Sequence, residues 1–420
     1  MRDAAVKEPS PDEASSYRWV VVITWMATHM WGFISIESLG IFLPSMRAEL
    51  GLSPIQEGWL GASTRIGMLF LAIPSGWLLS RFRPKPLTSV TLVAGALFVL
   101  FQAWAPIFAL LLLGRFLYGL TVVAREPART LLIKQWMRPR EIVLANATIE
   151  LLFGIGAGLY IVIPIVLELL DNSWRNTFYL FGTVSLTLTI LWHLLGKERI
   201  TPAYVSEMRS QERSPIGSIL RYKDLWLVGI GVVGVEIGFS ALGTFWPSYL
   251  LDTYGISLTS AAVLFSISGL VAAPGALGMS YLVTRTGKRK LILWVSGILI
   301  AFSSAGLLYT GSYPLLILIA VANGFSFTFF PIVMSVPFEL SGIKPREVAV
   351  AIGFLRSAMM TGAVIGPVLA GFLQDASGDL RLALTVTCLS ALTLTVSALL
   401  LPGRWNRLAA EQRVLERSSV

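Results

Sequence analysis

Long apolar runs alternate with short polar segments along the whole chain. Most runs reach about 20 residues, the length that an α-helix needs to cross the roughly 30 Å hydrocarbon core of a bilayer. The first run is too long for the apolar core of a signal peptide, so we interpret it as a span. The pattern predicts twelve spans, six in each half, at 19–43, 57–79, 86–104, 107–130, 143–167, 176–195, 225–251, 259–283, 290–310, 314–338, 347–373 and 379–401.

The composition excludes an ordinary soluble enzyme. Of the 420 residues, 55% are hydrophobic and 14% are charged, whereas soluble domains have about 25% charged residues. The single cysteine, Cys388, excludes an intramolecular disulfide and a cysteine-based metal cluster. We find no phosphate-binding loop and no catalytic constellation in the sequence. We therefore predict a protein that is not an enzyme and that uses no cofactor or metal.

The distribution of lysine and arginine predicts the orientation in the membrane. The net charge is +9, but the basic residues gather in alternate loops, which is typical of membrane topology rather than of nucleic-acid binding. Loops on the other side contain only Arg47, Arg175 and Arg381. We expect both termini in the cytoplasm and the chain in the inner (plasma) membrane. The predicted parts are a tail at 1–17, a bundle at 18–196, a loop at 197–223, a bundle at 224–402 and a tail at 403–420.

The two halves carry matching landmarks. Arg-Pro-Arg-Glu at 138–141 returns as Lys-Pro-Arg-Glu at 344–347, an offset of 206 positions. Gly119 corresponds to Gly324 at an offset of 205 positions. Such agreement predicts a duplicated six-helix unit, an arrangement found in secondary transporters whose halves rock about a central site.

Several motifs resemble those of the major facilitator superfamily, and the resemblance covers nearly the whole chain. The segment GWLLSRFRPK at 76–85 is similar to the signature between spans two and three, with Ser80 where the family usually has Asp. Arg115 and Gly119 match an Arg-x-x-x-Gly motif in span four. The resemblance implies an all-α membrane protein of twelve transmembrane helices in two pseudo-symmetric six-helix bundles. It also implies solute transport by alternating access.

Ionisable residues within predicted spans are candidates for function, because a charge in hydrocarbon costs several kcal/mol unless it is paired or hydrated. At a rise of about 1.5 Å per residue, six of them lie near the midplane, namely His29, Arg65, Arg115, Glu150, Glu236 and Arg356. The same count places Glu37 near the outer surface. Residues toward the inner surface and in the basic loops are candidates for gating, namely Arg81, Arg125, Glu126, Arg129 and Arg285.

The candidate roles follow from side-chain chemistry. We predict substrate binding by Arg65, Arg356, His29, Trp31 and Trp246, and proton coupling by Glu236, Glu150 and Arg115. Each role has a structural alternative. Arg65 could pair only with an internal glutamate, His29 and the tryptophans could serve packing, and Glu236 could form a fixed salt bridge to Arg65 or Arg356. Glu150 and Arg356, which are 206 positions apart, could pair across the halves.

These observations favour a secondary transporter that imports a small polar organic solute with protons. Three midplane arginines exceed two midplane glutamates by one charge, which favours an anion. The alternatives are an efflux antiporter for drugs or metabolites and a non-transporting membrane sensor on the same fold. The expected partners are the solute, protons and the lipid bilayer, without nucleic acid, and we expect a monomer.

Overall fold

The computed structural model describes residues 17–81, 83–137, 158–199, 217, 219–340 and 342–402, and these residues form helices without a strand. The N-terminal half contains α1 (Tyr17–Glu37), α2 (Leu39–Leu50), α3 (Pro54–Arg81), α4 (Pro84–Trp104), α5 (Phe108–Trp136), η2 (Leu159–Ile161), α7 (Val162–Leu169) and α8 (Trp174–Leu195). The C-terminal half contains α10 (Lys223–Tyr254), α11 (Leu258–Thr286), α12 (Arg289–Gly306), α13 (Tyr313–Ser326), η4 (Phe327–Phe329), α14 (Phe330–Glu339), α15 (Pro345–Ser377), α16 (Leu380–Leu389) and α17 (Leu392–Leu400). The predicted all-α architecture is confirmed.

Helices occupy the predicted spans wherever the chain is described. Within that part, nine helical segments are long and apolar enough to cross a membrane. The predicted span at 143–167 lies mostly outside the described residues. Three predicted spans are divided: 19–43 into α1 and α2, 314–338 into α13, η4 and α14, and 379–401 into α16 and α17.

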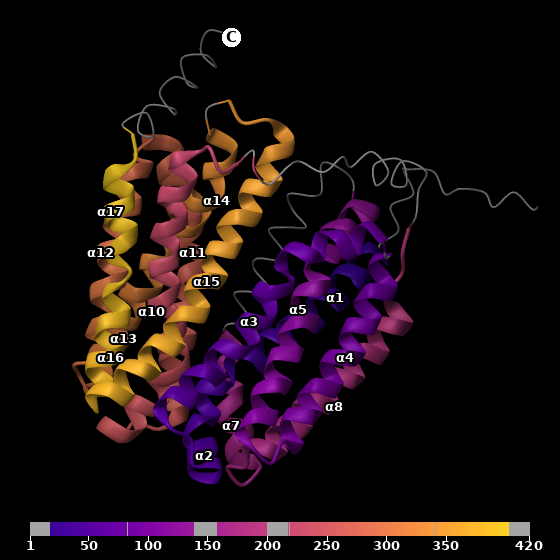
Figure 1. Cartoon of the computed structure of the whole chain (residues 1–420), viewed down its shortest axis with the longest axis vertical. Helices are drawn as coiled ribbons and strands as arrows, with labels where there is room; N and C mark the ends of the chain where they lie inside the picture. The colour runs from indigo at the N-terminus through magenta and orange to yellow at the C-terminus, as the bar shows by residue number, and fades with distance from the viewer. Residues whose placement is uncertain are drawn as a thin grey trace, which may run out of the picture.

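The helices gather into two bundles, one from each half of the chain (Figure 1). The bundles meet near α2 and diverge toward the opposite end, where α17 ends (Figure 1). We call these the closed end and the open end. The closed end contains α2, the start of α3 and the last turns of α10 and α15.

Equivalent glycines pack helices together in the two halves. A Cβ added at Gly119 of α5 would lie 2.0 Å from the carbonyl oxygen of Thr64 in α3. A Cβ added at Gly324 of α13 would lie 2.3 Å from the carbonyl oxygen of Ser268 in α11. Since both glycines and both partners are related by nearly the same offset, the two halves share one packing pattern. The duplication that the sequence indicated is therefore present in the structure.

Small residues let the two bundles approach closely at the closed end. A Cβ at Gly58 of α3 would lie 2.4 Å from the carbonyl oxygen of Pro367 in α15, and a Cβ at Gly371 would lie 2.5 Å from that of Pro54. A Cβ at Gly40 of α2 would likewise lie 2.2 Å from the carbonyl oxygen of Gly243 in α10. We call these contacts the glycine seam. Any larger side chain there would push the halves apart.

The repeated Lys-Pro-Arg-Glu motif begins α15. Glu347 accepts a hydrogen bond from the backbone nitrogen of Lys344 at 3.0 Å, which closes a capping box. The same carboxylate accepts hydrogen bonds from Tyr222 at 2.9 Å and from Arg221 at 3.3 Å. The hydrogen bond to Tyr222 and the nearby Glu347 charge raise the pKa of Arg221. The motif therefore fixes the start of α15 against the segment that leads into α10.

Candidate functional site

The first span is interrupted between α1 and α2, and the interruption frees backbone oxygens. The amide nitrogen of Ile41 donates to Ser38 instead of to Glu37. The hydroxyl of Tyr160 donates to the carbonyl oxygen of Glu37 at 3.4 Å. Such satisfaction by neighbouring side chains is what permits a broken helix inside a bilayer. The hydrogen bond from Tyr160 therefore holds the backbone of Glu37 in place at the break.

Arg65 of α3 pairs with the Glu37 carboxylate. The Nη2 of Arg65 donates to the Oε1 of Glu37 at 2.8 Å, and its Nη1 donates to the carbonyl oxygen of Gly61 at 3.3 Å. Both ionised side chains are buried. At 3.6 residues per turn, Gly58, Gly61 and Arg65 lie within about 60° of one another on α3. Since Gly58 and Gly61 contact the C-terminal half, Arg65 faces the interface between the bundles.

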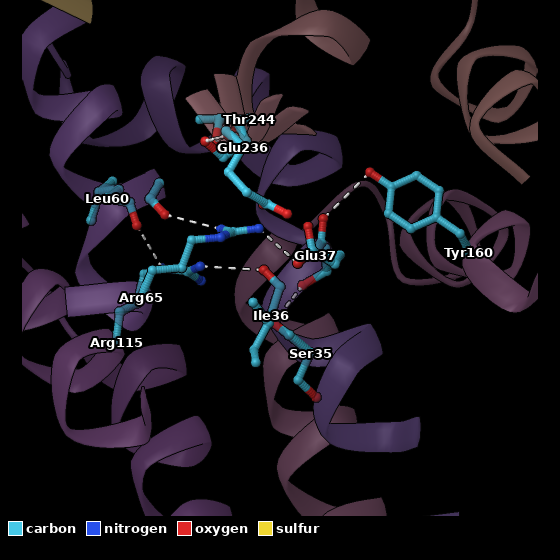
Figure 2. Close-up of polar contacts among 12 residues, drawn as sticks. Ser35, Ile36, Glu37, Leu60, Arg65, Arg115, Tyr160, Glu236 and Thr244 are labelled. Atoms are coloured by element: carbon cyan, nitrogen blue, oxygen red, sulfur yellow. Dashed lines mark hydrogen bonds and ion pairs between the residues drawn. The ribbon is translucent and has the colours of Figure 1, made fainter. Parts of the chain in front are cut away.

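A second carboxylate reaches this pair from the other bundle. Glu236 of α10 points toward the guanidinium of Arg65 and the carboxylate of Glu37 (Figure 2). Ser240 and Thr244, one and two turns along α10, donate to the carbonyl oxygens of Glu236 and Ser240 at 2.7 Å and 2.9 Å. The two hydroxyl groups on this face of α10 are thus bonded to the helix backbone, and the Glu236 carboxylate is directed toward Arg65 and Glu37. The site therefore places one guanidinium between two carboxylates from opposite halves.

Arg115 supports the site from behind. Its side chain is 1% exposed, its Nε donates to the carbonyl oxygen of Leu60 at 3.0 Å, and its Nη2 donates to that of Ile36 at 3.3 Å. These bonds connect α5 to α3 and to the end of α1 (Figure 2). Arg115 therefore holds the backbone next to Glu37, and its role in proton coupling stays a prediction.

Glu37 lies deeper in the bundle than the sequence pattern indicated. The apolar run ends at Leu43, and counting from that residue predicts Glu37 near the outer surface. The helical chain continues through α2 to Leu50, so Glu37 lies about 20 Å from that end at 1.5 Å per residue. Glu37 is 8% exposed and accepts a hydrogen bond from Arg65, so it is part of the site around Arg65. The apolar run stops at Pro44 and the polar residues after it, but the helix α2 continues through them to Leu50. A proline or a polar residue therefore did not mark the end of this helix.

The aromatic candidates pack within their own halves. The indole nitrogen of Trp31 donates to the carbonyl oxygen of Phe181 at 3.0 Å, and that of Trp246 donates to Leu307 at 3.3 Å. His29 stacks on Trp25 with ring centroids 5.0 Å apart. These contacts match the packing alternative for each residue. None of the three is brought to Arg65 by a contact that the structure describes, and their substrate role stays a prediction.

The structure describes only some of the remaining candidates. Arg356 of α15 is exposed, whereas Glu150, its predicted partner, lies outside the described residues. Arg285 at the end of α11 stacks over Tyr281, with its guanidinium carbon 4.6 Å from the ring centroid. The side chains of four other gating candidates are not among those that the structure describes, namely Arg81, Arg125, Glu126 and Arg129.

An ion-pair cluster at the closed end was not predicted from the sequence. Arg47 of α2 donates to Glu57 of α3 at 2.5 Å and 3.1 Å, and to Asp252 of α10 at 2.9 Å. The bond to Asp252 joins the two halves. The sequence pattern places Arg47 only in an outer loop. Arg47 and Asp252 are 205 positions apart, which is the offset that relates Gly119 to Gly324, so the pair joins equivalent positions of the two halves.

We expect Asp252→Asn to open the closed end only slightly. The side chains of Arg47 and Asp252 are 33% and 48% exposed, and exposed ion pairs contribute about 0–1 kcal/mol. The substitution should therefore change the ratio of closed to open conformers about fivefold or less. Distances between spin labels on the two halves, measured with and without the substitution, test this. A complete loss of the closed conformer would show that the ion pair, rather than the glycine seam, holds this end.

Comparison with known proteins identifies the family. The family model of the Major Facilitator Superfamily matches residues 25–343 and 237–417. The chain belongs to this superfamily of membrane transport proteins, and the resemblance found in its motifs is confirmed.

Relatives align along most of the chain. The hexuronate transporter of Bacillus subtilis (strain 168) is 25% identical over 370 residues, which cover 82% of this chain and 85% of that protein. A second protein of that strain, named "Probable galactarate/D-glucarate transporter GudP", is 23% identical over 95% of both chains. Among solved structures, the nucleoside transporter NupG matches with a TM-score of 0.73 at 17% identity, covering 91% of this chain and 98% of that one. The D-xylose-proton symporter matches with a TM-score of 0.72 at 15% identity, covering 91% and 97%. These structures confirm the twelve-helix fold in two bundles.

Proposed function

We propose that the protein is a secondary transporter that imports a small organic anion together with protons by alternating access. The observation that carries the proposal is the buried Arg65, held between Glu37 of its own half and Glu236 of the other half. Transporters of this architecture bind their substrate at the interface between the two halves. Arg65 places a positive charge at that interface. The named substrates of the two sugar-acid transporter relatives are acids, which supports an anion as the substrate.

Arg65 has the capacity to bind a carboxylate. A guanidinium has five N–H donors, and the hydrogen bonds to Glu37 and Gly61 engage one donor each of Nη2 and Nη1. The remaining donors form a planar fork that suits a carboxylate or a similar oxyanion. A substrate carboxylate would thus either add to the Glu37 pair or replace it.

Charge balance explains why a proton would accompany the anion. With both glutamates ionised, the two negative charges of Glu37 and Glu236 balance the two positive charges of Arg65 and Arg115, and the group is neutral. A bound monoanion leaves one uncompensated negative charge in a buried site, which is costly. Protonation of Glu37 or Glu236 restores neutrality. The site of these four groups therefore favours binding of one proton together with a monoanion.

The orientation of the open end follows from the lysine and arginine asymmetry. The basic loops belong to the end at which α1 begins and α17 ends, and cationic loops remain in the cytoplasm during insertion. In this proposal the structure represents the conformation that is open to the cytoplasm. The glycine seam and the Arg47–Asp252 pair close the outer side, and transport requires that they separate.

Uptake into proteoliposomes tests the proposed function. Purified protein is reconstituted, a pH gradient is imposed, and uptake is measured for radiolabelled sugar acids, dicarboxylates, neutral sugars and a cationic drug. We expect saturable anion uptake that increases with the proton gradient. Drug uptake against the gradient would instead favour the antiporter, and binding without flux would favour a sensor.

Glutamine substitutions test the coupling. Glu37→Gln or Glu236→Gln removes one titratable group and leaves the size of the side chain unchanged. We expect at least one variant to lose stimulation by the pH gradient, by about tenfold or more, while it retains counterflow of the anion. Glu49→Gln at the exposed closed end serves as the matched control. Full coupling in both variants would contradict the assignment and would direct attention to Glu150.

A further inference from the structure

A second arginine lies on the opposite half, at a position from which it could meet the far end of a substrate. Arg356, Met360, Pro367 and Gly371 lie within about 60° of one another on α15 at 3.6 residues per turn. Pro367 and Gly371 contact α3 through the glycine seam. The same face of α15 therefore continues toward the open end with Arg356 on it, opposite the continuation of α3.

The register of these two helices gives the level of each arginine. Pro367 meets Gly58 and Gly371 meets Pro54, so α3 and α15 are antiparallel. Seven residues from the first of these contacts, Arg65 lies level with Met360. Arg356 is four residues further along, about 6 Å closer to the open end. The two arginines thus belong to opposite halves, and their backbone positions are offset by roughly one helical turn.

The two arginines differ in their partners. Arg65 is paired with Glu37 at 2.8 Å. Arg356 is exposed, and the structure gives it no ion pair or hydrogen bond with any of the described residues. An exposed arginine that becomes enclosed when the halves close would need a compensating negative charge, because an unpaired buried charge is strongly destabilising.

Resting on the proposed function, we propose that the transported anion is a dianion, with one acidic group bound by Arg65 and the other by Arg356. When the open end closes, Arg356 adds one positive charge to the neutral group of Arg65, Arg115, Glu37 and Glu236. A dianion with one proton makes the total zero. A monoanion with one proton leaves one positive charge uncompensated. The dianion also bridges α3 and α15, so its binding favours closure of the halves.

A series of acids that differ in their number of carboxylates tests the proposal. Binding of butyrate, succinate, glutarate and adipate to the purified full-length protein is measured by competition against the best substrate in counterflow. For the wild type we expect the best diacid to compete at least tenfold better than butyrate, as for one charge-assisted bidentate contact. In Arg356→Gln this preference should fall to about threefold or less, with butyrate unchanged, and Arg356→Lys should retain much of it.

The controls separate this inference from the proposed function. Lys288→Gln removes one positive charge from an exposed loop and should leave the preference for diacids unchanged. If Arg65→Gln abolishes binding of all acids but Arg356→Gln affects mono- and diacids equally, the dianion proposal is wrong and the anion site remains. If the wild type binds no acid of the series and transports no anion, both proposals fail.

Discussion

Replacing Arg65 with glutamine will abolish transport of the anion. Arg65 is buried, and its guanidinium lies between Glu37 and Glu236. Its loss removes the charge-assisted hydrogen bonds to the substrate and leaves two carboxylates facing each other, so the site changes from neutral to repulsive for anions. We expect counterflow to fall by at least 100-fold, which corresponds to about 3 kcal/mol for hydrogen bonds with a charged group. The measurement compares the counterflow rate of the best substrate in the wild type and in Arg65→Gln.

Two further variants make this result specific. Lys288→Gln removes the same charge from the surface and should transport normally. The double variant Arg65→Gln with Glu37→Gln restores neutrality and should regain fold stability, measured by thermal unfolding, without regaining transport. Transport by the Arg65→Gln single variant at half the wild-type rate would contradict a role for Arg65 in substrate binding.

Replacing Gly371 with alanine will reduce the population of the conformation that this structure shows, in which the two bundles meet at the closed end. The new Cβ would lie 2.5 Å from the carbonyl oxygen of Pro54, across the interface. Overpacking of this kind costs about 1–3 kcal/mol, which corresponds to an about 5- to 150-fold change in the ratio of conformers. The measurement uses spin labels at Ala48 of α2 and Thr253 of α10, which are exposed on opposite halves.

The same helix offers a matched control. Gly353 is also within α15, but a Cβ there would meet no atom within 4 Å. Both alanine substitutions increase helix propensity by about the same amount, so the difference between them isolates the contact with α3. Label distances that change equally in Gly353→Ala and Gly371→Ala would show that the glycine seam does not control the conformation.

The length of the apolar runs predicted most of the fold, because a span needs about 20 apolar residues, and in a chain of this composition its backbone must be helical over most of that length. The offset between Gly119 and Gly324 also predicted the duplication, and both glycines serve the same kind of helix contact. Breaks such as the one at Ser38 could not be predicted in this way. They depend on partners from distant elements, as when Tyr160 of η2 satisfies the carbonyl oxygen of Glu37.

The sequence predicted Arg65 as a residue of the candidate site, but it did not predict that Glu37 is the partner of Arg65. Arg65 was selected because a charge near the midplane must face a partner or water, and the structure gives it Glu37 as a partner. Glu37 was misplaced because a depth count needs the true end of the helix, which the apolar pattern alone does not give. Cross-bundle contacts such as Gly58 with Pro367 depend on how two separate bundles meet, which no local pattern encodes.

The central claim is that an anion binds at Arg65 together with a proton, and proton uptake on binding tests it most directly. Purified protein is mixed with the best substrate in weakly buffered solution, and the released or absorbed protons are measured with a pH indicator. The account predicts uptake of about one proton per bound anion in the wild type and its loss in Arg65→Gln. Saturable binding of the anion to the wild type without any exchange of protons would contradict it.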